Sequence, residues 1–431
     1  MPGTKTAGGN HFDVVFLGDS LAGRLSAALC AKKGCRVLTV HDNKDLPTPW
    51  LTSSLLLERL LDFLDGRSCS TTPFHFQVIT QNQRIDINGK NPLKDELRRE
   101  LIAEHAEVAV FLDDMESLGN QLEEVLWEHQ GLPKPGIGNR FSFRKRCFRA
   151  DIPRRVFRQT LRERISEFSE PGARKILTSL FSGFSFTPSN SLTLAECALI
   201  WSGLGRQSGV FKNGLEELLL HRYKQFHGEE KALHHLARIR GSKDGTSKIL
   251  FDDDSVFTTD HLVFADREKI ALCEGLSAPA QGRMTHSHLS ANIKGRISPL
   301  LANNVILDGN PPLRINIEKS DSATKCRIEN AMLGDRGLSS AEQIEKRTRK
   351  ILPFIDLALQ PVATGAGSEL SLRSASHSSI VTAYEKIVFD HGRKFLCCGP
   401  SVIPELGTVG DILVAMTVTN KLLQATGNPP L

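Results

Sequence analysis

Hydrophobic and polar positions near the start of the chain predict a strand, a helix and a second strand in succession. Residues 14–17 are a continuous apolar run, 21–33 repeat apolar residues at helical spacing, and 37–40 are a second apolar run. Short continuous runs are typical of parallel strands with both faces buried. The three segments fit within the roughly 30 residues that a βαβ unit needs.

Similar patterns return later in the chain. A helical pattern ending near Phe226 precedes strand patterns at 234–239, 248–251 and 259–265. Residues 394–417 again read as a buried strand, a Gly- and Pro-rich turn and an apolar helix. We expect these segments to add strands to the sheet of the first unit, although a long intervening part of the chain, called the excursion below, separates them from it in sequence.

The excursion mixes helical and strand patterns. Residues 74–87 alternate around a polar turn and predict a β-hairpin. Asn91 and Pro92 suit the start of a helix, and apolar residues then recur every three to four positions down to Trp127, which predicts one long helix. Apolar helices are expected over 176–203.

Further sheet is expected over residues 275–335, and a capping box at 339–342 predicts a helix that ends near Leu352. A chain of 431 residues is long enough for two connected domains. The pattern predicts the α/β class: a Rossmann-like three-layer domain with an interleaved α+β substrate domain. The expected boundaries are 12–70, 206–270 and 376–431 for the first domain, 71–205 and 271–375 for the second, and 1–11 for a flexible tail.

The turn of the first unit carries the chemistry of a dinucleotide site. Gly18 permits a tight exit from the strand, and Gly23 allows helix and sheet to approach closely. Between them, where a side chain faces an anion at the helix N-terminus, stands Ser20. The second strand of such a unit ends in an acid that binds ribose hydroxyls; the register places His41 there, and a one-residue bulge would give this role to Asp42.

Composition narrows the class of protein further. A net charge of +5 over the whole chain favours neither nucleic acid nor an acidic substrate as its partner. The nine cysteines include no C-x-x-C pair and no metal spacing with histidine, so we expect reduced thiols, no metal site and a cytoplasmic location. The first eleven residues lack an apolar core, and no apolar run reaches the 18 residues of a membrane span.

One segment is strongly basic. Residues 140–164 hold ten Lys or Arg against Asp151 and Glu163, with four phenylalanines interleaved. Three interpretations stay open: a solvated helical face, binding to an anionic membrane surface that would make the protein peripheral to the membrane, and nucleic acid. No nucleic-acid fold signature accompanies the segment, so we do not expect nucleic acid as the partner.

Taken in order, these motifs resemble the FAD-dependent phytoene desaturases, protoporphyrinogen oxidases and related amine oxidases, within the FAD/NAD(P)-binding Rossmann superfamily. The first unit resembles the FAD fingerprint, residues 209–215 a Gly-Gly-Met-x-x-Leu stretch, 234–239 the adenine-flanking strand, and the C-terminal turn the second flavin motif. The resemblance implies FAD as cofactor. The implied contacts are Gly18, Ser20 and Gly23 to the pyrophosphate, His41 or Asp42 to the ribose, Leu236 to the adenine, and Gly399, Pro400, Gly407, Gly410 and Asp411 on the flavin side.

The resemblance implies an FAD-dependent oxidoreductase of desaturase or oxidase type. Its substrate would be apolar, such as an isoprenoid or an amine, and no catalytic residue is identified. Ser20 in place of glycine, His41 in place of an acid and Pro400 in place of a flavin-binding acid favour an alternative. This alternative is a non-catalytic relative, similar to the GDP dissociation inhibitors, that binds a prenyl or lipid group or a protein partner.

Overall fold

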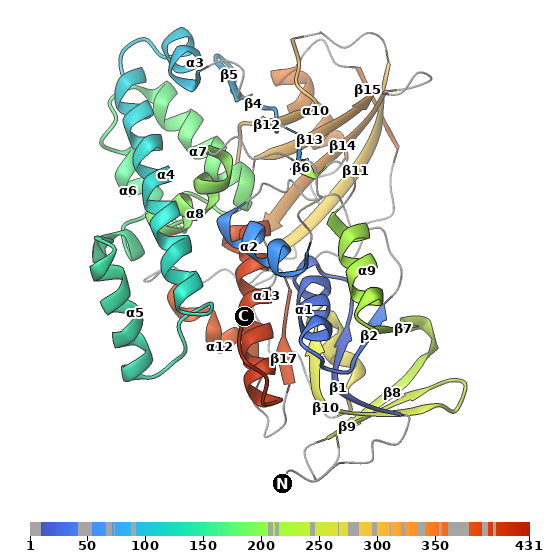
Figure 1. Cartoon of the computed structure of the whole chain (residues 1–431). Coiled ribbons are helices and arrows are strands. Elements are labelled where there is room, and N and C mark those ends of the chain that lie inside the picture. Colours follow the sequence, from blue (N-terminus) through green and yellow to red (C-terminus); the bar gives the residue numbers. More distant parts are fainter. Residues whose placement is uncertain are drawn as a thin grey trace.

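The chain folds around two β-sheets and a layer of helices (Figure 1). The computed structural model describes residues 10–41, 54–65, 71–72, 74–87, 92–205, 210–211, 215–241, 246–265, 267–274, 284–294, 300–310, 312–319, 324–333, 341–352, 356–360, 379–389, 395–399 and 402–431.

The first sheet joins segments from the beginning, middle and end of the chain. Its order is β16-β17-β10-β1-β2-β7, and β8 and β9 extend it as an antiparallel ribbon from β10. The pairs β17–β10, β10–β1, β1–β2 and β2–β7 are parallel. The strands are β1 (His11–Leu17), β2 (Val37–His41), β7 (Glu229–Ala232), β8 (Leu236–Gly241), β9 (Ser247–Phe251), β10 (Val256–Phe264), β16 (Val388–Phe389) and β17 (Phe395–Cys397).

This arrangement confirms that the sheet of the first unit is resumed after the excursion. The last four residues of β1, 14–17, are almost completely buried, as expected for a strand covered on both faces. Helix α1 (Leu21–Lys32) contacts both α9 (Leu215–Gln225) and α13 (Thr408–Ala425). Three segments far apart in sequence therefore pack into one α/β unit.

The second sheet lies above the first in Figure 1 and has the order β15-β11-β14-β13-β12-β4-β5. The predicted hairpin is confirmed as the antiparallel pair β4–β5, while β4 pairs with β12 in parallel, which the sequence did not reveal. The strands are β4 (Phe76–Ile79), β5 (Arg84–Ile87), β11 (Met284–Lys294), β12 (Asn304–Leu307), β13 (Leu313–Lys319), β14 (Thr324–Leu333) and β15 (Asp356–Gln360). A separate two-stranded pair joins β3 (Thr71–Thr72) and β6 (Val210–Phe211).

Helices form a third part of the molecule, on the left of Figure 1. The central contact is between α4 and α8, and the expected apolar helices of 176–203 are α7 and α8. These helices are α3 (Leu93–Glu100), α4 (His105–Glu128), α5 (Ile137–Arg149), α6 (Leu161–Ile165), α7 (Pro171–Ser185) and α8 (Leu194–Gly205). The remaining helices are α2 (Leu55–Phe63), α10 (Ala341–Ile351), α11 (Ser379–Thr382) and α12 (Tyr384–Ile387). Among the described residues, no helix combines the length and apolarity needed to cross a membrane.

The prediction of one long helix down to Trp127 is wrong, because the structure has two helices, α3 and α4. Residue Leu101 adopts an extended conformation, with φ −111° and ψ 130°, and ends α3. Helix α3 begins at Leu93 after Pro92, and Asn91 lies outside the described residues.

The break is fixed by a carboxylate from another helix. Glu170, just before α7, accepts hydrogen bonds from the N–H groups of Ile102 (3.1 Å), Ala103 (3.2 Å) and Glu104 (3.1 Å). The Glu170 carboxylate thus satisfies the backbone donors of the short linker between α3 and α4. The apolar spacing runs on through the break, so the periodicity did not reveal it.

Candidate functional site

The candidate site lies where parallel strands end and helices begin. Strands β1, β2, β10 and β17 run parallel, so their carboxyl ends meet at one edge of the sheet. Helix α1 starts at this edge three residues after β1. Ligands of open α/β sheets bind in the crevice outside such an edge.

Gly18 forms the tight exit from β1. Its φ is +107°, a conformation that costs glycine little and other residues much, and its N–H donates to the Val40 carbonyl at 2.9 Å. This bond ties the turn to the end of β2. The sequence-based role of Gly18 as the turn residue agrees with this geometry.

Ser20 caps α1 and links it to the C-terminal part of the chain. Its Oγ accepts a hydrogen bond from the Gly23 N–H (3.1 Å) and donates one to the Cys398 carbonyl (2.8 Å). The side chain is buried. Ser20 thus stabilises the turn, in addition to standing where the dinucleotide fingerprint has glycine.

Two glycines permit the close approach of three segments at this edge. A Cβ added to Gly23 would lie 2.5 Å from the Cβ of Ala265, and one added to Gly399 would lie 2.1 Å from the Ala265 carbonyl oxygen. Both distances are shorter than side chains tolerate. The predicted residues Gly23 and Gly399 are therefore brought together around the end of β10.

The first two residues of α1 each carry a backbone N–H group. The N–H groups of Leu21 and Ala22 have no hydrogen-bond partner within the part of the chain that the structure describes. Leu21 is 7% exposed and Ala22 0%. The positive end of the helix dipole adds to these donors, so the position favours an anion.

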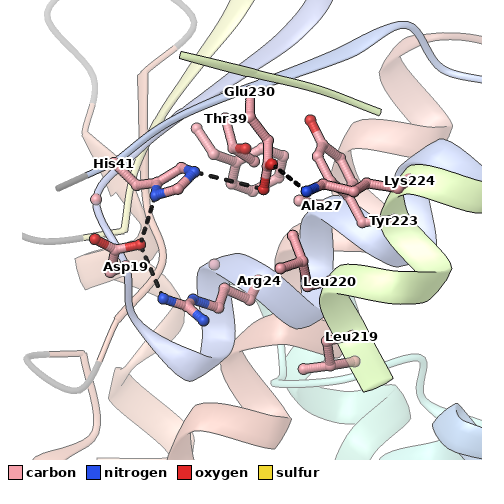
Figure 2. Close-up of a pocket in the computed structure, with 13 residues that line it drawn as sticks. Asp19, Arg24, Ala27, Thr39, His41, Leu219, Leu220, Tyr223, Lys224 and Glu230 are labelled. Atoms are coloured by element: carbon pink, nitrogen blue, oxygen red, sulfur yellow. Dashed lines mark hydrogen bonds and ion pairs between the residues drawn. The ribbon is translucent and has the colours of Figure 1, made fainter. Parts of the chain in front are cut away.

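Four charged side chains and the titratable His41 form an ion-pair chain beside this turn (Figure 2). Asp19 lies 3.1 Å from Arg24 and 3.5 Å from His41 Nδ1; Glu230 lies 3.4 Å from His41 Nε2 and 3.0 Å from Lys224. Positive and negative groups alternate along it. His41 stands at its centre, at the end of β2 where the register placed it.

The neighbours of His41 shift its protonation. The hydrogen bond with Glu230 raises the pKa of His41 above its ordinary value, burial opposes this rise, and the charge of Asp19 adds to it. The same hydrogen bond lowers the pKa of Glu230. The imidazolium and carboxylate forms therefore favour each other.

A cavity of about 200 Å³ opens beside the ion-pair chain. Figure 2 shows side chains from α1, β2, β7 and α9 around it, with apolar and aromatic groups of α9 facing the polar ones. The lining residues are Phe16, Gly18, Asp19, Gly23, Arg24, Ala27, Thr39, His41, Leu219, Leu220, Tyr223, Lys224 and Glu230.

Other predicted contacts lie elsewhere. Leu236 begins β8 and is not among the residues that line the cavity. Gly407, with φ +54°, precedes α13, and an added Cβ there would lie 3.0 Å from the Phe184 carbonyl. At Gly410 the corresponding distance to the Ile403 carbonyl is 2.6 Å, which makes this a packing glycine.

Asp411 is buried in the first turn of α13. Desolvation raises the pKa of the Cys398 thiol, and the charge of Asp411 contributes to the same rise, so the two groups are electrostatic neighbours. Cys398 follows β17, which places Asp411 at the edge where Ser20 lies. Asp42 and Pro400 lie outside the described residues.

Most of the ion-pair chain was not predicted from the sequence. Asp19 and Arg24 flank Ser20 in sequence, but neither belongs to the fingerprint. Glu230 comes from β7, and its nearness to His41 depends on the parallel pairing of β2 with β7, in which Thr39 faces Glu230. No local sequence pattern predicts the pairing of β2 with β7.

Comparison with known proteins supports the fold. No protein-family model and no curated protein sequence matches the chain. Among solved structures, cyclohexylamine oxidase from Brevibacterium oxydans IH-35A has a TM-score of 0.55 and 10% identity, with 97% of this chain and 100% of that chain covered.

Two further solved structures are similar to this chain over nearly its full length. An oxidoreductase from Methanosarcina mazei has a TM-score of 0.61 and 13% identity, with 94% of this chain and 99% of that one covered. Putrescine oxidase bound to putrescine has a TM-score of 0.55 and 11% identity, covering 96% and 99%. The chain therefore has the Rossmann-like α/β fold of these oxidases over nearly its full length.

Proposed function

We propose that the chain binds FAD at the carboxyl edge of its parallel sheet and acts as an FAD-dependent oxidoreductase. The observation that carries the proposal is the buried start of α1, where the N–H groups of Leu21 and Ala22 have no partner among the described residues. Buried backbone donors without partners are costly. The pyrophosphate of a dinucleotide would satisfy both.

The residues at the phosphate position fit this group. Gly18 leaves the backbone open, and the helix dipole favours a negative charge. The hydroxyl of Ser20 is already bonded to Gly23 and Cys398, so it keeps the turn in place and leaves the two free donors to the anion.

The adenosine position fits in a different way from the family pattern. His41 stands where an acid is expected, but Glu230 lies 3.4 Å from it and Asp19 3.5 Å. These carboxylates are the hydrogen-bond acceptors that the end of β2 lacks. The adjoining cavity offers apolar surface from α9 for a flat ring.

The redox chemistry of such an enzyme would be supplied by the cofactor, which would serve as hydride acceptor. The chain's own residues would bind and orient the dinucleotide through α1 and the ion-pair chain. The amine substrates named for two proteins of the same fold make an amine the first substrate class to test, followed by apolar polyenes such as isoprenoids.

A second candidate function is a non-catalytic binding protein for a prenyl group, a lipid or a protein partner. The observation that favours it is that the side chains at the ribose and phosphate positions already have partners within the chain: His41 is paired with both Asp19 and Glu230, and Ser20 with both Gly23 and Cys398. Polar side chains that are already hydrogen-bonded within the chain gain less free energy from contacts with a bound nucleotide.

The purified protein separates the two candidates. The FAD proposal predicts visible flavin absorbance that survives gel filtration, or its appearance after incubation with FAD and removal of the excess. Release of FAD on denaturation should follow. A folded protein that stays colourless after this incubation contradicts the proposal and favours the second candidate.

A backbone substitution tests the anion position directly. Leu21→Pro removes one free N–H at the first helical position, where proline is tolerated, and Ser20 already has the extended conformation (φ −63°, ψ 152°) that precedes proline. We expect the Kd for FAD to rise about tenfold or more, since a hydrogen bond to a charged group contributes about 1.5 to 3 kcal/mol.

Leu21→Ala is the matched control, because it removes the same apolar side chain and keeps the N–H. Fluorescence titration with FAD measures both variants, and circular dichroism confirms their folding. Equal affinities in the two variants would place the anion away from α1.

A further inference from the structure

Helix α5 carries large apolar side chains on its outer surface. Ile137 is 91% exposed, Phe141 67% and Phe148 81%. Soluble surfaces rarely gather aromatic side chains at this level of exposure without a partner. The helix packs on α4 at the outer side of the helical layer (Figure 1).

The exposed apolar residues form one stripe. At 3.6 residues per turn, positions 137, 141 and 148 project within about 40° of one another around the helix axis. Phe143 and Cys147 project from the opposite side and are buried, which anchors α5 to the rest of the molecule. The orientation of the stripe toward solvent is therefore fixed by the core.

Basic side chains flank this stripe. Arg144 lies to one side of it, and Lys145 and Arg149 to the other, and all three are exposed. None has an acidic partner within the described part of the chain. By contrast, Arg140 pairs with Glu385 at 3.2 Å and Arg146 with Glu128 at 2.6 Å.

The segment after α5 adds more positive charge. Arg154, Arg155 and Arg158 are exposed and likewise have no acidic partner among the described residues. The ring of Phe157 lies 6.0 Å from that of Phe143, which places this segment beside α5. Residues 144–158 thus hold six exposed cations with no acidic partner in the part of the chain that the structure describes.

We propose that α5 docks on an anionic membrane surface, with Ile137, Phe141 and Phe148 in the interfacial layer and the flanking cations on lipid headgroups. A lipid interface suits both the apolar stripe and the basic side chains beside it, because its acyl region accepts apolar groups and its anionic headgroups attract cations. A nucleic acid would engage the cations, but it has no continuous apolar layer for a stripe that includes Ile137 together with two phenylalanines. The inference does not rest on FAD binding.

Co-sedimentation of the full chain with vesicles tests the proposal. We expect binding to phosphatidylcholine vesicles that contain phosphatidylserine, little binding to phosphatidylcholine alone, and weakening as salt is raised. The triple variant Arg144→Gln, Lys145→Gln, Arg149→Gln should lower partitioning on the order of a hundredfold, at about fivefold per charge.

A second variant isolates the apolar contribution. Phe141→Ser with Phe148→Ser should also lose vesicle binding, although the net charge is unchanged. The matched control, Arg98→Gln, Lys346→Gln, Lys350→Gln, removes three exposed cations from other helices and should bind like the native chain. Circular dichroism checks the folding of every variant.

Three results would overturn the proposal. They are absence of binding to anionic vesicles, equal loss of binding in the control variant, and displacement from vesicles by duplex DNA together with tighter binding to that DNA. FAD retention is measured separately on the same samples, so failure here and failure of the proposed function are distinguishable.

Discussion

At the scale of single residues, His41 shows how one side chain can link several elements. His41, at the end of β2, pairs with Asp19 of the turn and with Glu230 of the neighbouring strand. Asp19 also pairs with Arg24, and Glu230 with Lys224. Ser20 acts similarly, since one hydroxyl caps α1 and bonds Cys398, 378 positions away in sequence. Both residues use their polar groups in contacts within the chain.

The pH dependence of stability tests the role of His41. Its pKa is raised in the folded state, so its contribution is complete below the unfolded value of 6.5 and is lost as pH rises through the folded pKa. Urea unfolding should show His41→Gln destabilised most near about pH 5.5, with the difference shrinking above about pH 6.5.

Glu230→Gln supplies the comparison, because it removes the principal cause of the raised pKa. The pH dependence of this variant above about pH 6.5 should approach that of His41→Gln. A difference between native chain and His41→Gln that is the same at all pH values would show that His41 is not charged in the ion-pair chain.

At the scale of elements, close approaches decide where helices and strands meet. Gly23 lets α1 contact the end of β10, and Glu170 binds the backbone of the linker where α3 ends before α4. Neither effect depends on the hydrophobic pattern of the element itself. Both depend on a residue or a strand that belongs to another element.

Gly23→Ala tests the packing of α1. The added Cβ would lie 2.5 Å from the Cβ of Ala265, and we expect overpacking to lower the free energy of unfolding by about 1 to 3 kcal/mol. Denaturant unfolding with an unchanged m-value measures this loss.

Gly138→Ala is the control, as this glycine also lies in the first turn of a helix, α5, and an added Cβ meets no atom within 4 Å. Here we expect no loss, or a gain of up to about 1 kcal/mol from helix propensity. Similar losses at both positions would contradict the steric account of Gly23.

At the scale of the whole molecule, buried polar contacts join the second sheet to the helical layer. Arg314 of β13 donates hydrogen bonds to the carbonyls of Gly183 and Phe184 at the end of α7, and lies 3.6 Å from Glu329. Its guanidinium also lies 4.1 Å from the centre of the Phe186 ring. Burial lowers the pKa of Arg314 to about 10, which leaves it charged at neutral pH.

Arg314→Met should destabilise the protein strongly. Removal of one partner of a buried ion pair costs about 3 to 5 kcal/mol, because the other charge and the two carbonyls lose their donor. Arg327→Met is the control: this arginine lies 3.6 Å from the same Glu329 but is partly exposed, and we expect about 0 to 1 kcal/mol. Equal losses in thermal or urea unfolding would contradict the account.

Local patterns predicted the elements that depend on a few neighbouring residues. The first βαβ unit, the hairpin of β4 and β5, and the resumed sheet with β10 and β17 are confirmed. The break at Leu101, the parallel pair β4–β12 and the place of Glu230 were not predicted. Each of these depends on a partner distant in sequence.

The sequence alone determined the fold class and the glycine turn, since period and turn chemistry are properties of short segments. Only the tertiary structure decided how the turn is used. It showed that Ser20 is bonded within the chain and that His41 lies between two acids. It also showed that the buried N–H groups of Leu21 and Ala22 have no partner among the residues that the structure describes. These outcomes depend on which strands become neighbours, and strand order is set by the packing of the whole chain.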